Sequence, residues 1–146
     1  MSGSAAEPET IVCDTSFIGV QERAGGARPN WPQAVVDRLD AAVLAISVIS
    51  LAEVRAGRIY ANWGRERSDR QEARLAAFLQ VPLDEATLDI YAEIHAWSLR
   101  GNAIPHNDMW IAATAISRRF ALVSCDQDFD RIAGPFPLDH IYLRPN

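Results

Sequence analysis

Four acidic residues in four separate segments have the right chemistry to share a divalent cation. Asp14 and Asp126 each follow a short apolar run, while Glu53 and Asp108 lie in segments with helical character. Carboxylates a few ångströms apart cannot all stay ionised in a protein site. Mg²⁺ or Mn²⁺ relieves that repulsion because hard cations prefer carboxylate oxygen. The set indicates metal-dependent chemistry on a phosphate ester, provided that the fold brings the four side chains together.

The elements that must position these acids are short apolar segments alternating with helical ones. We expect strands at Thr10–Cys13, Val43–Ile46, Val81–Leu83, Ala121–Ser124 and Ile141–Leu143. We expect helices from Thr15 or Ser16 to about Arg23, from Pro32 to about Ala42, from Ser47 or Ser50 onward, over Arg65–Leu79 and Glu85–Arg100, and over Asp108–Arg119 after an Asn107 cap. This alternation predicts an α/β fold with a short central parallel sheet of four to five strands, flanked by helices on both faces.

In such folds, ligands bind outside the carboxyl ends of the strands. Asp14 and Asp126 lie at two of these ends, and Glu53 lies about two turns into the helix after the second strand. Asp108 falls in the first turn of its helix, where the helix dipole also favours a negative group. We therefore expect the four acids to converge on one edge of the sheet. Asp128, two residues beyond Asp126, is a candidate for a further metal ligand.

Each of these acids also has a purely structural interpretation. Asp14 is a good residue type for a helix N-cap, and Asp108 is a good type for a first helical turn. Glu53 stands among apolar neighbours and could face solvent. The functional interpretation is stronger for the four together than for any one alone.

Composition fits a single globular domain of 146 residues, with residues 1–9 as a loose tail. No apolar run is long enough to span a bilayer, and the polar, acidic N-terminus has no signal-peptide pattern, so we expect a cytoplasmic protein. A net charge of −5 argues against nucleic-acid binding by bulk charge, but does not exclude a nuclease. Cys13 and Cys125 are expected to be reduced thiols.

Six arginines cluster within twenty residues and have two interpretations. Interleaved acids favour an ordinary salt-bridged helix surface, and the alternative is a rim that contacts RNA phosphates. Arg55 is the member we would test first, because it follows Glu53 on the same helix. The cluster consists of Arg55, Arg58, Arg65, Arg67, Arg70 and Arg74.

Rival acid-lined α/β proteins do not match. All 14 basic residues are arginine, so the lysine that a response-regulator receiver requires is absent. Asp14-Thr15-Ser16 lacks the second acid of a haloacid-dehalogenase Asp-x-Asp motif, and Gly25-Gly26 is no dinucleotide-binding turn.

Four motifs in order, spread over residues 10–143, resemble the PIN domain, and more narrowly a VapC toxin of a VapBC toxin–antitoxin pair. They are Val-Cys-Asp-Thr-Ser-Phe-Ile, Ser-Leu-Ala-Glu-Val, Asn-Asp-Met-Trp-Ile-Ala-Ala and Leu-Val-Ser-Cys-Asp-Gln-Asp-Phe. The resemblance implies a Mg²⁺- or Mn²⁺-dependent endoribonuclease that uses metal-activated water and leaves 5′-phosphate and 3′-hydroxyl ends. Such a route needs no histidine, and His95, His106 and His140 show no shared pattern.

By the same resemblance, the catalytic acids fall on Asp14, Glu53, Asp108 and Asp126, with Asp128 as an additional metal ligand. Possible hydroxyl or RNA contacts fall on Thr15, Ser16 and Arg55. The last motif departs from many relatives, so the division of roles between Asp126 and Asp128 stays open.

The resemblance also implies partners: an RNA substrate, a cognate VapB-type antitoxin and a homodimer, with a heterotetramer or larger assembly when the antitoxin binds. No membrane partner is expected. The alternative from another functional class is a catalytically silent PIN-like module that binds RNA or antitoxin without turnover.

Overall fold

A five-stranded, wholly parallel sheet lies at the centre of the structure, which is a computed structural model that describes residues 6–25 and 29–145. The strand order is β3-β2-β1-β4-β5. The strands are β1 (Thr10–Cys13), β2 (Val43–Ser47), β3 (Leu79–Val81), β4 (Ala121–Ser124) and β5 (His140–Tyr142). The predicted α/β fold with four to five parallel strands is confirmed.

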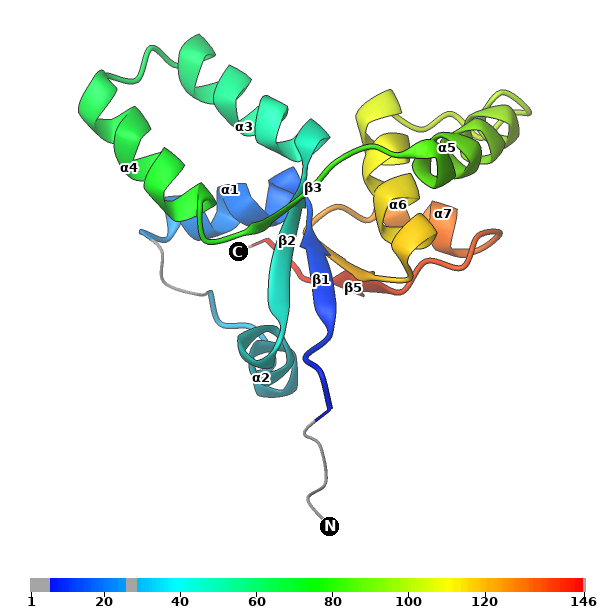
Figure 1. Cartoon of the computed structure of the whole chain (residues 1–146), viewed down its shortest axis with the longest axis horizontal. Helices are drawn as coiled ribbons and strands as arrows, with labels where there is room; N and C mark the ends of the chain where they lie inside the picture. Colours follow the sequence, from blue (N-terminus) through cyan, green and yellow to red (C-terminus); the bar gives the residue numbers. More distant parts are fainter. Residues whose placement is uncertain (1–5, 26–28, 146) are drawn as a thin grey trace.

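Helices cover both faces of the sheet, as Figure 1 shows. One group comprises α1 (Thr15–Arg23), α2 (Gln33–Ala41), α3 (Val48–Tyr60) and α4 (Arg65–Leu75). The other comprises α5 (Glu85–Ser98), α6 (His106–Arg118) and α7 (Asp128–Ala133). In Figure 1, α3 and α4 form an arm on one side of the strands, and α5, α6 and α7 lie on the other side.

Alternate residues of each strand feed two separate apolar cores. In β1, Ile11 and Cys13 join the core that includes Phe17 of α1, whereas Val12 joins the core built on α6. Successive strand side chains point to opposite faces of a sheet, and parallel sheets are buried on both. This explains why the central strands are continuously apolar rather than alternating. The small residues Ala112, Ala113 and Ala115 let α6 pack closely, since all three are fully buried.

Several expected boundaries are wrong, and the last strand is His140–Tyr142 rather than Ile141–Leu143. The third strand is Leu79–Val81 rather than Val81–Leu83, and α4 ends at Leu75 rather than Leu79. The register pairs Leu79 with Ala45 and Val81 with Ser47, so this short edge strand is set by its pairing with β2. Helical periodicity carries no information about that pairing.

Two expected helix caps are also wrong. Asp14, not Thr15 or Ser16, is the N-cap of α1. α6 begins at His106 after Pro105, so Asn107 is inside the helix. Proline has a fixed φ that suits a helix start, and the Pro105 carbonyl accepts the Met109 amide at 3.2 Å. By contrast, α3 starts at the first of its two expected positions, with Ser47 as the N-cap, and Asp84 caps α5 just before the expected helix start at Glu85.

The ends and the sulfur atoms complete the description. Of the predicted tail, residues 1–5 lie outside the described residues, while Glu9 accepts the Val43 amide at 2.8 Å and pairs with Arg38. Neither Cys13 nor Cys125 forms a disulfide within the described residues, which agrees with the expected thiols. None of the helices in residues 6–25 and 29–145 is long and apolar enough to cross a membrane.

Candidate functional site

The site lies where the strand order reverses. The chain builds outward from β1 through β2 to β3, and then returns to add β4 and β5 on the other side of β1. In open α/β sheets, this switch point leaves a crevice at the carboxyl ends of the strands. Asp14 directly follows β1, and its amide donates to the Val123 carbonyl of β4 at 3.0 Å. Asp126 follows β4, so the crevice is flanked by these two acids.

Three carboxylates form the tightest group in the described structure. One oxygen from each of Asp108, Asp126 and Asp128 lies within 4.8 Å of the other two. Asp108 comes from the first turn of α6, Asp126 from the loop after β4, and Asp128 from the start of α7. The predicted closeness of Asp108 and Asp126 is confirmed, and Asp128 is a full member of the group.

Asp14 is buried, with only 3% of its surface exposed. Its Oδ2 accepts the Ser16 amide at 3.2 Å and the Ser16 hydroxyl at 2.6 Å. Burial raises the pKa of Asp14, the Ser16 and Thr15 hydrogen bonds oppose that rise, and the charge of Glu53 adds to it. The structural and the functional interpretation of Asp14 therefore hold together, because the residue caps α1 and also lies close to another acid of the site.

Glu53 reaches the same region from α3. Its Oε1 accepts the Thr15 hydroxyl at 2.8 Å, directly beside Asp14. The Ser16 hydroxyl in turn accepts the Cys125 amide at 3.0 Å and ties α1 to the loop that carries Asp126. The Thr15 hydroxyl therefore holds Glu53 in place, and the Ser16 hydroxyl holds Asp14 and the backbone of the loop after β4.

Electrostatics joins the two subsets of acids. Burial is the largest cause that raises the pKa of Asp108, and the charges of Asp14, Asp126, Glu53 and Asp128 add to it, so that together they bring it to about 7. A pKa near 7 means that the surroundings of Asp108 disfavour its ionised form. All five acids thus act on one position, although Asp14 and Glu53 do not belong to the tightest group.

This donor set suits a hard divalent cation. It offers only carboxylate oxygens, which Mg²⁺ and Mn²⁺ prefer, and no cysteine or histidine joins the group of three. The repulsion that raises the Asp108 pKa is also the energy that a bound cation would remove. The residues present therefore fit the metal that the sequence indicates.

Sequence reasoning missed a chain of contacts behind Asp126. The Ser124 hydroxyl contacts the Asp126 backbone at both its amide (3.2 Å) and its carbonyl (3.0 Å). It also lies 2.7 Å from His140 Nε2, while His140 Nδ1 lies 2.7 Å from an oxygen of Asp130. His140 had no expected role, and the structure places it behind Asp126 as a support that does not enter the acidic group. Only the β4–β5 pairing brings residues 124 and 140 together.

The Asp130–His140–Ser124 line has the connectivity of a hydrolase triad but not its accessibility. Ser124 is fully buried, and the His140 side chain is 1% exposed. A nucleophile must reach substrate, and Ser124 instead holds the backbone of the loop. Asp126 continues the support, since its Oδ1 accepts the Asp128 amide at 2.9 Å.

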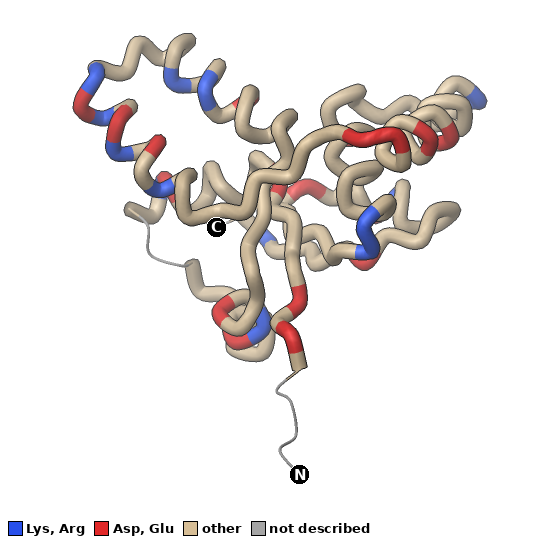
Figure 2. The backbone as a smooth tube through the Cα atoms, viewed as in Figure 1, with Lys and Arg blue, Asp and Glu red and all other residues tan. Residues whose placement is uncertain are grey.

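The arginine cluster is mostly ion-paired. Arg55 and Arg58 both bind Glu72 at 2.7 Å, and Arg74 pairs with Glu22. Figure 2 shows the alternation of blue and red along α4. Arg67 lies over the Trp63 ring at 3.6 Å. The salt-bridged interpretation is confirmed for this surface, and an RNA contact of Arg55 stays a prediction.

Comparison with known proteins agrees with this geometry. The PIN domain model matches residues 11–135. Ribonuclease VapC4 of Mycobacterium tuberculosis is 34% identical over 100 residues, which are 64% of this chain and 74% of that protein.

Two solved structures share the fold. VapBC2 from Rickettsia felis, bound to a DNA fragment from its promoter, has a TM-score of 0.75 at 20% identity and covers 92% of this chain and 98% of its own. VapBC-5 from Mycobacterium tuberculosis, a member of the VapBC family of toxin–antitoxin systems, has a TM-score of 0.67 at 24% identity and covers 93% and 100%. The chain therefore belongs to the PIN-domain family, among its VapC members.

Proposed function

We propose that this protein is a Mg²⁺- or Mn²⁺-dependent endoribonuclease and the toxin of a toxin–antitoxin pair. The observation that carries the proposal is the convergence of Asp108, Asp126 and Asp128 near the β1/β4 switch point, with Asp14 and Glu53 close enough for their charges to add to the effect of burial on the pKa of Asp108. A pure RNA-binding module would gain nothing from carboxylates facing a polyanion. A nuclease needs them, because they hold the cation that approaches the phosphate.

The chain's own residues divide the work. Asp108, Asp126 and Asp128 would hold the cation, since their oxygens converge within 4.8 Å. Asp14 and Glu53 would complete the negative surface, with their oxygens fixed by the Ser16 and Thr15 hydroxyls. When bound, Mg²⁺ or Mn²⁺ offsets charge on the scissile phosphate and makes water a stronger nucleophile. Fixing the ligand oxygens in advance lowers the reorganisation that the reaction requires.

The partners follow from the relatives. VapC4 is named a ribonuclease, and the two similar structures are VapBC assemblies. We propose RNA as the substrate, a VapB-type antitoxin as the inhibitor, and a homodimer as the basic unit, all in the cytoplasm. An antitoxin guanidinium would suit the acidic site, because arginine pairs bidentately with carboxylates and would exclude the cation.

The test is cleavage of end-labelled RNAs by purified protein in Mg²⁺ or Mn²⁺. Asp14→Asn and Asp108→Asn should each lower cleavage by at least about 10³-fold, a loss of the size seen when charge stabilisation of a transition state is removed. Asp89→Asn is the matched control, because Asp89 is exposed on α5. Excess EDTA should stop the wild type, Mn²⁺ should restore it, and products should carry 5′-phosphates.

Two results would contradict the proposal. Cleavage that persists in excess chelator would exclude the metal mechanism. Tight RNA binding by a folded wild type that cuts no RNA in any divalent ion would instead establish the silent binding module.

A further inference from the structure

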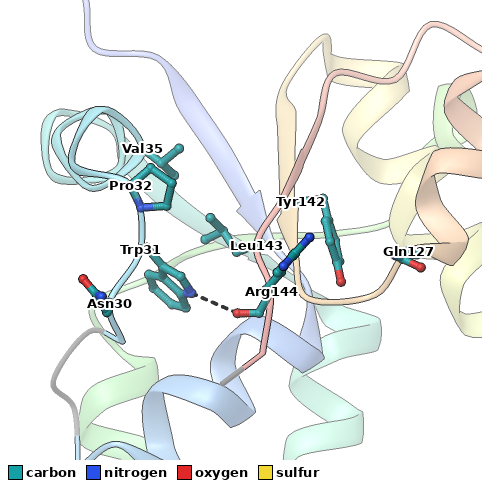
Figure 3. A pocket seen from close by; sticks show the side chains of 8 residues that line it. All are labelled: Asn30, Trp31, Pro32, Val35, Gln127, Tyr142, Leu143 and Arg144. Carbon is teal, nitrogen blue, oxygen red and sulfur yellow. Dashed lines mark hydrogen bonds between the residues drawn. The ribbon is translucent and has the colours of Figure 1, made fainter.

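A cavity of about 580 Å³ opens between the segment that precedes α2 and the end of β5. Figure 3 shows its lining side chains. A volume of this size falls in the usual range for small-molecule and cofactor sites, which is roughly 300–1,000 Å³. The cavity is lined by Asn30, Trp31, Pro32, Val35, Gln127, Tyr142, Leu143 and Arg144.

This cavity adjoins the loop that carries Asp126 and Asp128. Gln127, on one wall, stands between Asp126 and Asp128 in the chain. Tyr142 is paired in register with Ser124, two residues before Asp126. A molecule in the cavity would therefore lie directly beside the loop that carries two of the proposed metal ligands.

One wall is a fixed aromatic surface. Trp31 is 7% exposed and stacks on Phe17 with ring centroids 5.4 Å apart. Its indole nitrogen donates to the Arg144 carbonyl at 3.3 Å, which Figure 3 draws as a dashed line. Tyr142 supplies a second, partly exposed ring, and the Arg144 side chain lies between the two rings in the view of Figure 3. The rings are thus held by the sheet and by α1 before any ligand arrives.

Three polar side chains border the same cavity without a protein partner. Within the residues that the structure describes, no hydrogen bond or ion pair uses the side chains of Asn30, Gln127 or Arg144. Amides carry both a donor and an acceptor, which matches the edge of a nucleobase. The Arg144 guanidinium is a cation beside a strongly acidic site, and guanidinium groups bind phosphate bidentately.

We propose that this cavity binds one unpaired nucleotide of the RNA substrate, next to the phosphate that is cut. The inference rests on the proposed ribonuclease function and adds a determinant of its specificity. Tyr142 offers a face for the base, Asn30 and Gln127 contact the edge of the base, and Arg144 binds the adjoining phosphate. Single-stranded RNA is recognised in this way, with unstacked bases on aromatic side chains and hydrogen bonds to their edges.

A segment of a partner protein is the competing occupant. The lining favours a nucleotide for two reasons. The unpaired cation, Arg144, matches a phosphate. The cavity also borders the Asp126–Asp128 loop, so occupancy by a nucleotide places the next phosphate against the cation site.

The direct test is nuclear magnetic resonance of the metal-free protein in EDTA, titrated with the four nucleoside 5′-monophosphates. We expect saturable shifts of the Trp31 indole and Gln127 side-chain amide signals, with one base bound at least about threefold more tightly than the others. Ribose 5-phosphate should bind at least about tenfold more weakly, because it lacks the base. Tyr142→Ala and Arg144→Gln should each weaken the best nucleotide by fivefold or more. Arg100→Gln is the matched control, since Arg100 is also exposed and lies outside the cavity.

Three outcomes would overturn the proposal: no shift at these groups, equal shifts with ribose 5-phosphate, or shifts produced only by antitoxin peptide. A second arm sequences the cut ends from a randomised RNA pool. Wild type should show one preferred base beside the cut, and Tyr142→Ala and Gln127→Ala should flatten the preference at that position. A wild type that binds nucleotides here but cuts no RNA would refute the proposed function and leave the binding site standing. If variants that no longer bind nucleotides keep the wild-type cutting preference, the cavity is not a determinant of specificity, and the proposed ribonuclease function stands.

Discussion

Asp108 is the residue on which burial and the negative charges of the other acids act together. Burial and four neighbouring acids raise its pKa to about 7 from an ordinary value of 3.8. Between those two pH values, the folded protein holds a proton on Asp108 that the unfolded chain has lost. The stability of the metal-free protein therefore falls as pH rises through this window. Asp14 contributes in the same direction, because its pKa is raised as well.

This shift predicts a pH dependence that one substitution removes. In EDTA, the free energy of unfolding of the wild type should fall by about 2 kcal/mol between pH 5 and pH 8, a figure reduced for the partial exposure of Asp108. Asp108→Asn should lose much less, because asparagine is neutral throughout. Urea denaturation at pH 5, 6, 7 and 8 measures both, with Asp89→Asn as the exposed control. Parallel pH profiles for wild type and Asp108→Asn would mean that repulsion does not govern this site.

His140 supports the acid Asp126 indirectly, through Ser124. It bridges Asp130 and Ser124, and Ser124 in turn holds both backbone polar groups of Asp126. Partners that orient a ligand commonly change metal affinity by about 10–100-fold. His140 is therefore a positioning residue for Asp126 rather than a catalytic one.

Replacement of His140 separates positioning from simple stability. His140→Leu should weaken Mn²⁺ binding by about tenfold, because the Ser124 hydroxyl loses the partner that holds its direction. His140→Gln should recover much of that affinity, since its amide can still bond Ser124. Calorimetric titration with Mn²⁺ provides the measurement. Leu138→Ala is a control that loses core packing but removes none of these hydrogen bonds, so an equal loss of affinity there would reduce His140 to a packing role.

At the scale of elements, helix α3 positions Glu53, and the N-terminus of α3 is fixed by a serine cap. Ser47 caps the helix, is fully buried, and accepts the Ser50 amide at 3.1 Å. Glu53 lies two turns later and meets Thr15 of α1. The position of this acid thus depends on a helix start and on one contact between helices.

Removal of this cap should loosen α3. Ser47→Ala should lower the free energy of unfolding by about 1–2 kcal/mol, since loss of a serine cap leaves a buried backbone donor unpaired. Ser68→Ala, a change in α4 at a partly exposed residue that caps nothing, should alter stability by less than about 0.5 kcal/mol. Denaturation in urea compares them. A neutral Ser47→Ala would show that packing of Leu51 and Val54, not the cap, fixes the start of α3.

The order of elements was predictable because each strand is a short apolar run and the caps Ser47 and Asp84 are strong local signals. The closeness of Asp108 and Asp126 followed from the rule that ligands gather at strand ends. Short-range patterns could not reveal α7, which is six residues long, or the edge strand at Leu79–Val81. The His140–Ser124 contact was equally hidden, because it depends on how β5 pairs with β4.

At the scale of the whole molecule, negative charge is concentrated where it is least tolerated. The chain carries a net charge of −5, and five of its carboxylates act on one crevice at the switch point. Arginine is paired elsewhere: in the part of the chain that the structure describes, the arginines of α3 and α4 bind acids of α1 and α4. Because no arginine among these residues forms an ion pair with the five acids, the negative charge is relieved by a proton on Asp108 at low pH, and at higher pH it calls for a cation or a partner.

A divalent ion should therefore stabilise the whole fold, and more so at high pH. With Mn²⁺ held at one concentration, about 100 times its dissociation constant at pH 8, the free energy of unfolding at pH 8 should rise by about 2.7 kcal/mol. The gain should be largest at pH 8 and small at pH 5.5, where protons compete for Asp108. Thermal unfolding with and without Mn²⁺ at the two pH values measures the difference, and NaCl of equal ionic strength controls for general screening. Asp108→Asn should respond weakly at both pH values. An equal response of wild type to NaCl and to Mn²⁺ would mean that diffuse charge, rather than a bound ion, resolves the repulsion in the crevice.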